Sequence, residues 1–482
     1  MLNRRKLLAL GGVAAGGMVA GPYALWTTLD ASAAEQPHAH GTGSTGPAVT
    51  PTYTPFTLKM PVPPVLAPSV RRSTVDVYRV PIRVANTEIL PGVSTQVLTF
   101  NGSFPGPTIR TPQGRRAAVT FVNQLDAASN VHLHGGHTAA TSDGHPLDVI
   151  QPGGARTYDY GNTQAGATLW YHDHAHHLEA EHVYRGLQGF YLIEGSDEAA
   201  LNLPSGAYDV PIMLRDAGFD DQGALVFDLM DPNAYTTLLA NGKAQPYFPV
   251  AARKYRFRFL NGATLREFTL NLGGVPMTQI GSDGGLLPAP VTRTELVLGP
   301  AERADVVIDF TGKSGQKLVL EDAFGGSVMR FDVGAAVADR SRVPARLRPL
   351  PVLPAAAVTR KVTLGLIPGE GFAIDGKLFD PNRVDFQVQK GATEIWEVTN
   401  QDTDLGIAHT FHMHLAQFQI LDRNGGPVLA GESGFKDTVL IRAGETVRVK
   451  ATFTDFTGRY VYHCHMLEHS ELGMMAQMEI VP

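Results

Sequence analysis

The chain has 482 residues, a formal net charge of −6 at pH 7 and 43% hydrophobic residues. This length allows about three domains, and the slightly acidic balance argues against a nucleic-acid partner. The only cysteine, Cys464, excludes an intrachain disulfide, so the stability of the fold must come from packed cores.

Residues 1–34 are predicted to be a twin-arginine export signal. Arg4 and Arg5 precede a Gly-rich apolar run, and the small residues at 31–33 form a suitable cleavage site. A retained membrane anchor is the alternative, but the glycines and Pro22 make the run only weakly hydrophobic. We therefore expect an exported protein, located in the periplasm, the extracellular medium or the cell wall. After cleavage no stable membrane insertion is expected.

Residues 35–68 are rich in Gly, Thr, Pro and Ala, and this composition predicts a flexible linker. Strands dominate the sequence that follows, because apolar and polar residues alternate over stretches such as 255–259 and 446–453. Long stretches with helical periodicity are scarce.

A sequence repeat of about 140 residues occurs three times. Three motifs recur in the same order: NGSFPGPTI, NGKAQPYFP and DGKLFDPN; then TFVNQ, RFLNG and EVTNQ; then PGGARTYDY, GPAERADVVIDF and RAGETVRVKATF. Asn123, Asn261 and Asn400, which close the strands of the second motif, lie 138 and 139 residues apart. The repeat predicts an all-β chain of three Greek-key β-sandwich domains, at 69–205, 206–350 and 351–482.

Apart from His38 and His40 in the linker, the histidines lie in the first and third units. The chain has 17 histidines, and none lies between His182 and His409. Four H-x-H pairs stand out: His132/His134, His172/His174, His412/His414 and His463/His465. Histidines two apart on a strand point to the same face, so eight imidazoles can surround a compact metal cluster. The simplest geometry packs the first unit against the third, with the cluster in their interface.

Cys464 lies between His463 and His465 and therefore points to the opposite face of its strand. His409 differs in parity from His412 and His414, so it also faces away from the cluster. With His469 and Met474, these residues offer a thiolate, two imidazoles and a thioether, the ligand set of a blue copper site. A zinc site is the weaker alternative, because it would not use a methionine or explain eight further histidines.

The motifs HLHG, WYHDH, HTFHMH and HCHMLEHSELGMM, in this order and spacing, resemble the copper-binding signatures of the multicopper oxidases. The resemblance extends from about residue 70 to 482 and implies three cupredoxin-like domains and four copper ions. It implies type 1 copper ligands His409, Cys464, His469 and Met474, and type 2 ligands His132 and His412. For the type 3 pair it implies His134, His172, His174, His414, His463 and His465.

The sequence departs from the family pattern at Leu133 and at Thr410-Phe411. His176 shares the parity of His172 and His174, yet the family does not use it. His176, His177 and His182, with Glu179 and Glu181, form either a copper-entry site or a solvated loop, and the second is favoured. No role follows from the sequence for His137 or His145.

The expected function is oxidation of phenols or aromatic amines at the type 1 copper, coupled to reduction of dioxygen to water at the trinuclear cluster. Cys464 would link the two centres, and Glu468 and Asp143, which match acidic residues of the family, would relay protons. A cuprous oxidase and a bilirubin-type pigment oxidase are the alternatives. A structural protein without copper is disfavoured because the ligand set is complete. A copper nitrite reductase is disfavoured because it would have two domains and would lack the four paired motifs. We expect a monomer whose partners are a small reductant and dioxygen.

Overall fold

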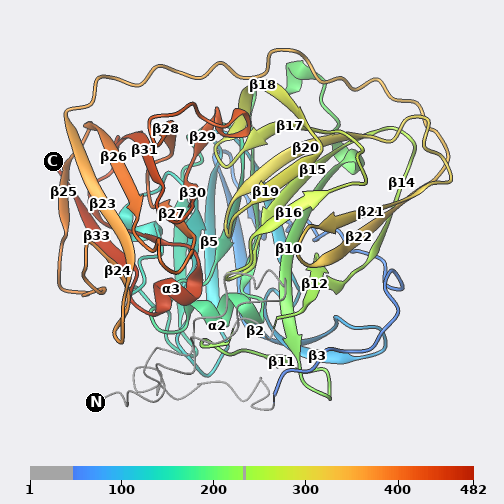
Figure 1. Ribbon diagram of the computed structural model, residues 1–482, viewed down its shortest axis with the longest axis horizontal. Coiled ribbons are helices and arrows are strands. Elements are labelled where there is room, and N and C mark those ends of the chain that lie inside the picture. The colour runs from blue at the N-terminus through green and yellow to red at the C-terminus, as the bar shows by residue number, and fades with distance from the viewer. Residues whose placement is uncertain (1–46, 232–234) are drawn as a thin grey trace, which may run out of the picture.

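A computed structural model describes residues 47–231 and 235–482, so the predicted export signal and residues 35–46 lie outside the described residues. The strands form three successive sets, here called the first, second and third units, each built of two sheets (Figure 1). The all-β prediction is confirmed. The predicted boundaries, near 205 and 350, lie between these sets. In the part of the chain described, no helix is both long and apolar enough to cross a membrane.

The first unit has the sheet β1-β2-β5-β7, with β3 also on β2, and the sheet β4-β9-β8-β6. Its strands are β1 (Val70–Arg71), β2 (Val75–Glu88), β3 (Ser94–Phe100), β4 (Gly106–Pro112), β5 (Arg116–Asn123), β6 (His132–His134), β7 (Ala155–Tyr160), β8 (Ala167–His172) and β9 (Gln188–Glu194). The helix α2 (Glu179–Arg185) lies between β8 and β9.

The second unit has the sheet β13-β12-β10-β15-β20-β17-β18, with β11 on β10, and the sheet β14-β22-β21-β16-β19. Its strands are β10 (Asp209–Phe219), β11 (Leu225–Val226), β12 (Thr237–Ala240), β13 (Lys243–Ala244), β14 (Tyr247–Val250), β15 (Lys254–Asn261), β16 (Phe268–Asn271), β17 (Met277–Ser282), β18 (Gly285–Arg293), β19 (Glu295–Leu298), β20 (Arg303–Asp309), β21 (Lys317–Asp322) and β22 (Gly326–Val333).

The third unit has the sheets β24-β23-β26-β31-β28-β29 and β25-β33-β32-β27-β30. Its strands are β23 (Val358–Ile367), β24 (Gly371–Ile374), β25 (Phe386–Gln389), β26 (Thr393–Asn400), β27 (His409–Met413), β28 (Phe418–Arg423), β29 (Phe435–Lys436), β30 (Thr438–Ile441), β31 (Thr446–Thr452), β32 (Gly458–Cys464) and β33 (Met475–Val481). The helix α3 (Leu467–Glu471) follows β32 and lies beside α2 in Figure 1.

The three units repeat one topology. In each, an early strand pairs in parallel with the strand that ends in asparagine: β2 with β5, β10 with β15, and β23 with β26. Each of these asparagines is buried, and its Nδ2 donates to two backbone carbonyls, one in the loop that follows and one 27, 37 or 41 residues further along the chain. The amide side chain thus ties the loop to the rest of its unit, which explains why asparagine recurs at this position.

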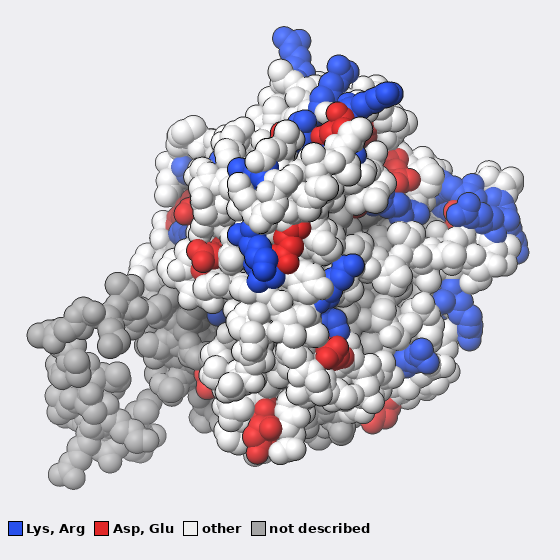
Figure 2. Space-filling model, turned by 90° about the vertical axis from the view of Figure 1, so that its right-hand side faces the viewer, with Lys and Arg blue, Asp and Glu red and all other residues white. Residues whose placement is uncertain are grey.

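Each unit buries its own apolar core. Leu265 is an exception, because it comes from the second unit and packs in the core of the third, in the same cluster as Cys464. The segment 334–357 connects the second unit to the third and arches over the molecule at the top of Figure 1. On the face shown in Figure 2, side chains of both charge signs are scattered among uncharged ones.

Residues 47–68 are ordered against the folded units, so the prediction of a flexible linker is wrong for this part. Met60 donates its backbone N–H to Tyr247 and is 1% exposed, within the core of the second unit. Further along, Leu66 and Thr108 join the segment to β4 of the first unit. Prolines pre-set an extended backbone here, and an extended chain can dock along sheet edges without forming a regular strand.

Candidate metal centres

Four strands carry the paired histidines to one place. His132 of β6 lies opposite His172 of β8 in the first unit, and His412 of β27 lies opposite His463 of β32 in the third. Directly opposed residues point to the same face of a sheet. The second histidine of each pair comes two residues later, within β6 for His134 and just past the end of the strand for His174, His414 and His465. All eight side chains are at most 1% exposed: His132, His134, His172, His174, His412, His414, His463 and His465.

The imidazoles of the first and third units interleave. The rings of His132 and His414 stack with centroids 3.7 Å apart, as do those of His134 and His412. Three groups bring their nitrogens within 4.8 Å of one another: His132, His134 and His412; His134, His172 and His465; and His174, His414 and His463. Each group takes residues from both units, as the predicted interface requires.

Seven of the eight rings have one nitrogen that contacts an oxygen atom outside the cluster. Backbone carbonyls face Nδ1 of His132, His172, His412 and His463, and carboxylates face Nδ1 of His174 and His414 and Nε2 of His134. These contacts leave an inner nitrogen on each ring. Those of His132, His134, His174, His412, His414 and His463 have no hydrogen-bond partner within the described chain, and Nε2 of His172 and His465 face each other at 3.4 Å.

The electrostatics of the cluster fit bound metal ions. Burial lowers the pKa of all eight histidines, and neighbouring imidazoles lower several of them further, so the rings are neutral. Each unpaired buried nitrogen costs about 1–3 kcal/mol. A metal ion binds neutral imidazole and would satisfy these lone pairs, with the outward contacts fixing each tautomer. The residues present therefore fit copper.

Two aspartates hold the cluster in a crossed arrangement. Asp143 of the first unit accepts from Nδ1 of its own His132 through its backbone oxygen at 2.6 Å and contacts Nδ1 of His414 through its carboxylate at 2.7 Å. Asp437 of the third unit contacts its own His412 through its backbone oxygen at 2.8 Å and His134 through Oδ1 at 3.0 Å. Burial, with a smaller contribution from Asp148, raises the pKa of Asp143 well above its usual range. The sequence pointed to Asp143 but not to Asp437.

A second centre lies on the other face of β27 and β32, where Phe411 and Cys464 are directly opposed. Sγ of Cys464 lies 3.6 Å from Nδ1 of both His409 and His469, and these two nitrogens are 3.0 Å apart. Nε2 of His409 contacts Asp402 at 2.8 Å, which leaves Nδ1 facing the thiol. Burial raises the pKa of Cys464 to about 12, so its thiol ionises readily only against a cation.

Strand register distinguishes the two adjacent methionines. Met475 pairs with His463 and shares its face of the sheet, whereas the backbone of Met474 accepts from the N–H of Cys464 at 3.1 Å. Met474 is fully buried in the same core cluster as Cys464. The register therefore places Met474, and not Met475, on the side of the Cys464 centre.

Glu468 lies in α3, at the contact between the third unit and the second. Its Oε1 accepts from the hydroxyl of Thr264 at 2.6 Å, and its Oε2 has no hydrogen-bond partner among the described residues. Burial raises the pKa of this carboxyl to about 7. Glu468 is thus a buried carboxylate, and its hydrogen bond is with the second unit and not with the histidine cluster.

The sequence suggested that the acidic and histidine-rich segment after His174 is a solvated loop, and this prediction is wrong for most of it. Glu179, Glu181 and His182 belong to α2 and are buried. Glu179 contacts Nδ1 of His174 at 3.3 Å, and His182 contacts Asp173 at 3.2 Å. A loop of turns precedes α2; His177 in it is exposed and His176 half-buried, and neither joins a group of metal-binding geometry in the described chain. Strand parity fails for His176 because the chain enters a turn at 176–178, beyond the end of β8.

Two further histidines without a predicted role join the first unit to the third. Nε2 of His137 contacts Asp455 at 2.9 Å, and Nε2 of His145 contacts Gln477 at 3.1 Å. Both contacts lie in the interface that contains the cluster.

Three family models match the chain, at residues 82–198, 167–321 and 352–482, and all three describe multicopper oxidases. The chain is 34% identical to a laccase of Bacillus subtilis, covering 88% of this chain and 98% of the relative. It is 36% identical to a bilirubin oxidase of Albifimbria verrucaria, covering 89% and 82%. The crystal structure of a laccase from Pediococcus acidilactici superposes with a TM-score of 0.84 at 35% identity, covering 91% and 95%. Histidine clusters at two centres, three cupredoxin-like units and these likenesses lead to one conclusion: the chain belongs to the multicopper oxidase family.

Proposed function

We propose that this protein oxidises small electron-rich molecules, such as phenols and aromatic amines, one electron at a time and reduces dioxygen to water. The observation that carries the proposal is β32, which presents Cys464 to one centre and His463 and His465 to the other. The similarity to enzymes named laccase supports this substrate class. The similarity to an enzyme named bilirubin oxidase makes a bilirubin-type pigment the second candidate, and Cu(I) remains the third.

We assign one type 1 copper to His409, Cys464, His469 and Met474, a type 2 copper to His132 and His412, and a type 3 pair to the remaining six histidines. Bound copper would supply one-electron redox chemistry at both centres. The chain supplies a covalent connection between them, because the Cys464 ligand is bonded through its backbone to His463 and His465. It also excludes water, since all the proposed histidine and cysteine ligands are buried.

Dioxygen reduction also consumes protons, and we propose that Asp143 and Glu468 supply them. Both carboxyls are buried, and burial raises the pKa of each, to about 7 for Glu468, so Glu468 can hold and release a proton near neutral pH. Asp143 touches His414, whereas Glu468 reaches the second unit through Thr264. Asp143 therefore lies at the contact between the first and third units, and Glu468 at the contact between the second and third units.

The test uses two variants that separate the centres. Cys464→Ser should abolish the blue absorption band and substrate oxidation, because the thiolate is both ligand and connection. His132→Ala should keep the blue band but stop oxygen consumption, because it removes a ligand from the cluster only. A Cys464→Ser protein that stays blue and active would contradict the proposal. Comparing kcat/KM for a methoxyphenol, bilirubin and Cu(I) on one copper-loaded preparation would identify the reductant class.

A further inference from the structure

The second unit contains no histidine, yet one of its side chains reaches the cluster. Arg303, the first residue of β20, is about 1% exposed. Its Nη1 and Nη2 donate to Oδ1 and Oδ2 of Asp437 at 2.7 and 2.5 Å, a two-point ion pair. Asp437 in turn contacts His134 and His412, so one residue separates Arg303 from proposed ligands of both other units.

Arg303 is itself held by all three units. Its Nε donates to the carbonyl of Thr168 in the first unit at 2.9 Å, and its backbone N–H donates to Asp283 of the second at 2.8 Å. Asp283 also binds Nζ of Lys436, the residue before Asp437, at 2.9 Å. The guanidinium therefore has a fixed position, and its two-point ion pair fixes the orientation of the Asp437 carboxylate.

The orientation of His134 shows why this matters. Nε2 of His134 contacts Asp437 Oδ1 and the Thr438 hydroxyl at 3.0 and 2.9 Å, so its Nδ1 points inward. The other rings with an outward contact turn Nδ1 outward instead. If the carboxylate of Asp437 rotated, His134 would lose the partner that selects this orientation. Arg303 prevents this rotation, because it holds both carboxylate oxygens.

We propose that Arg303 is a positioning residue for the cluster: it fixes the Asp437 carboxylate and thereby the inward Nδ1 of His134. It also fixes the ring of His412 through Thr438, whose hydroxyl donates to Asp437 Oδ1 at 3.0 Å and contacts Nδ1 of His412 at 3.2 Å. The inference rests on the proposed function, since it concerns ligands of the proposed cluster. Through Arg303 the second unit would contribute to the metal site, although it supplies no histidine ligand.

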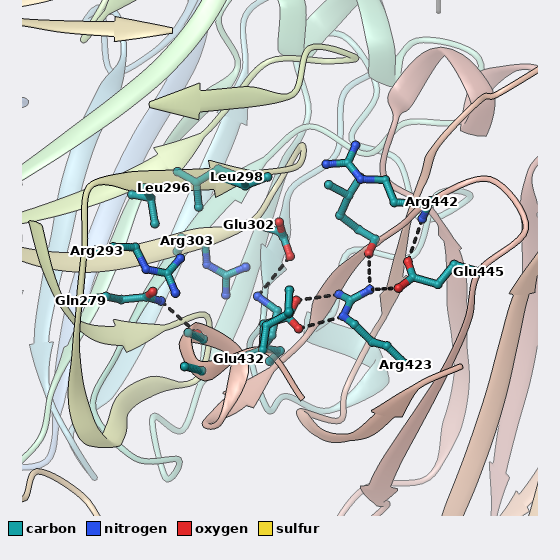
Figure 3. A pocket seen from close by; sticks show the side chains of 16 residues that line it. Gln279, Arg293, Leu296, Leu298, Glu302, Arg303, Arg423, Glu432, Arg442 and Glu445 are labelled. Atoms are coloured by element: carbon teal, nitrogen blue, oxygen red, sulfur yellow. Dashed lines mark hydrogen bonds and ion pairs between the residues drawn. The ribbon is translucent and has the colours of Figure 1, made fainter. Parts of the chain in front are cut away.

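The surroundings of Arg303 allow a chemical-rescue experiment. Arg303 lines a cavity of about 420 Å³ between the second and third units. Figure 3 shows Arg303 beside Arg293 on one side and Arg423, paired with Glu432 and Glu445, on the other. Replacing Arg303 by alanine would open a space for a free guanidinium ion next to Asp437. Arg423 lines the same cavity without touching a proposed ligand or Asp437, so Arg423→Ala is a matched control.

Three readouts follow in copper-loaded Arg303→Ala: the blue band, the type 2 signal in electron paramagnetic resonance, and copper content after dialysis against graded chelator. We expect the blue band to remain, the type 2 hyperfine splitting to change, and the affinity for cluster copper to fall about 10- to 100-fold. Low-millimolar guanidinium, but not equal sodium, should restore the type 2 signal. Arg303→Lys, which keeps the charge but not the two-point geometry, should fall between, and Arg423→Ala should match the wild type.

An unchanged type 2 signal and unchanged copper affinity in Arg303→Ala would overturn the inference. So would loss of the blue band in both Arg303 variants, because that would show a general structural role. A wild-type protein without a type 2 signal would instead contradict the proposed function, so the two failures are distinguishable.

Discussion

At the scale of residues, alternation along single strands predicted which side chains the structure brings together into two groups. Cys464 and His463 do point to opposite faces of β32, because side-chain direction in a strand depends only on position. Asp437, Arg303 and Asp402 were not predicted. Their partners lie far away in the sequence or across a turn, and a single acidic or basic residue in a sequence is usually a surface residue.

The register of β33 leads to a prediction about the type 1 potential. Met474→Leu should raise the reduction potential of the blue site, because a thioether donates electron density that favours oxidised copper. Leucine has a similar volume, so the loss of packing should be below about 1.5 kcal/mol. Met475→Leu is the matched control and should leave the potential unchanged. Redox titration of the blue band measures both, and a shift only in Met475→Leu would contradict the register argument.

The buried carboxyl of Glu468 leads to a prediction about stability. Burial raises its pKa from 4.5 in the unfolded chain to about 7, so the folded state binds the proton more tightly. The carboxyl therefore costs no stability well below pH 4.5; the cost grows as the pH rises from 4.5 to 7 and levels off above 7 at about 3 kcal/mol. Glu468→Gln keeps an acceptor for Thr264 without this cost. The free energy of unfolding of the copper-free variant should thus exceed that of the wild type more at pH 8 than at pH 5.

Urea unfolding at both pH values measures this difference, and Glu295→Gln, at an exposed position, is the control. Equal pH dependence in Glu468→Gln and wild type would refute the burial argument. In the copper-loaded enzyme the same variant tests the proposed proton role. Reoxidation by dioxygen should slow while reduction of the blue site is unaffected, as stopped-flow absorbance would show.

At the scale of elements, composition misled the sequence analysis twice. The Pro- and Thr-rich residues 47–68 form no regular strand of their own, yet they bond to β14 and β4, strands remote in the sequence. The charged residues of α2 suggested a solvated loop. Inside the molecule, however, Glu179 contacts His174 and Ser470, and His182 contacts Asp173. Charged side chains become buried where partners from other elements satisfy them, and such partners leave no local signal.

The docking of residues 47–68 leads to a prediction about stability. Met60→Ala should lower the free energy of unfolding by roughly 2 to 4 kcal/mol, because it leaves a cavity in the core of the second unit. Val62→Ala, two residues away at a position 45% exposed, should change it by less than about 0.5 kcal/mol. Chemical denaturation measures both variants. A negligible effect of Met60→Ala would mean that the segment is not docked in solution.

At the scale of the whole molecule, the threefold repeat could be predicted because the same asparagine closes the same strand in every unit. How the units meet could be predicted only where histidines marked the interface. The contacts of the second unit, through Leu265, Thr264 and Arg303, carry no comparable pattern, since apolar and polar side chains of these kinds are common in any sandwich.

We also propose that the protein is exported in the folded state, from Arg4 and Arg5 ahead of the apolar run. Replacing both by lysine should leave the product in the cytoplasm, because the pathway recognises the arginine pair. Cell fractionation followed by immunoblotting measures the distribution. Unchanged export of the lysine variant would refute this route, and a Lys6→Arg variant controls for the general effect of substitution in the leader.

Because each histidine group draws on both the first and the third unit, the cluster cannot load before these units have docked. The Cys464 centre differs, since its proposed ligands all belong to the third unit and can bind metal once that unit alone has folded. Metallation then has an inherent order, and the last ions to enter report completed assembly. Because such an ion binds only when the two units are docked, its binding also stabilises the docked arrangement. A chain in which only the third unit has folded would present the Cys464 centre complete and each of the three histidine groups incomplete.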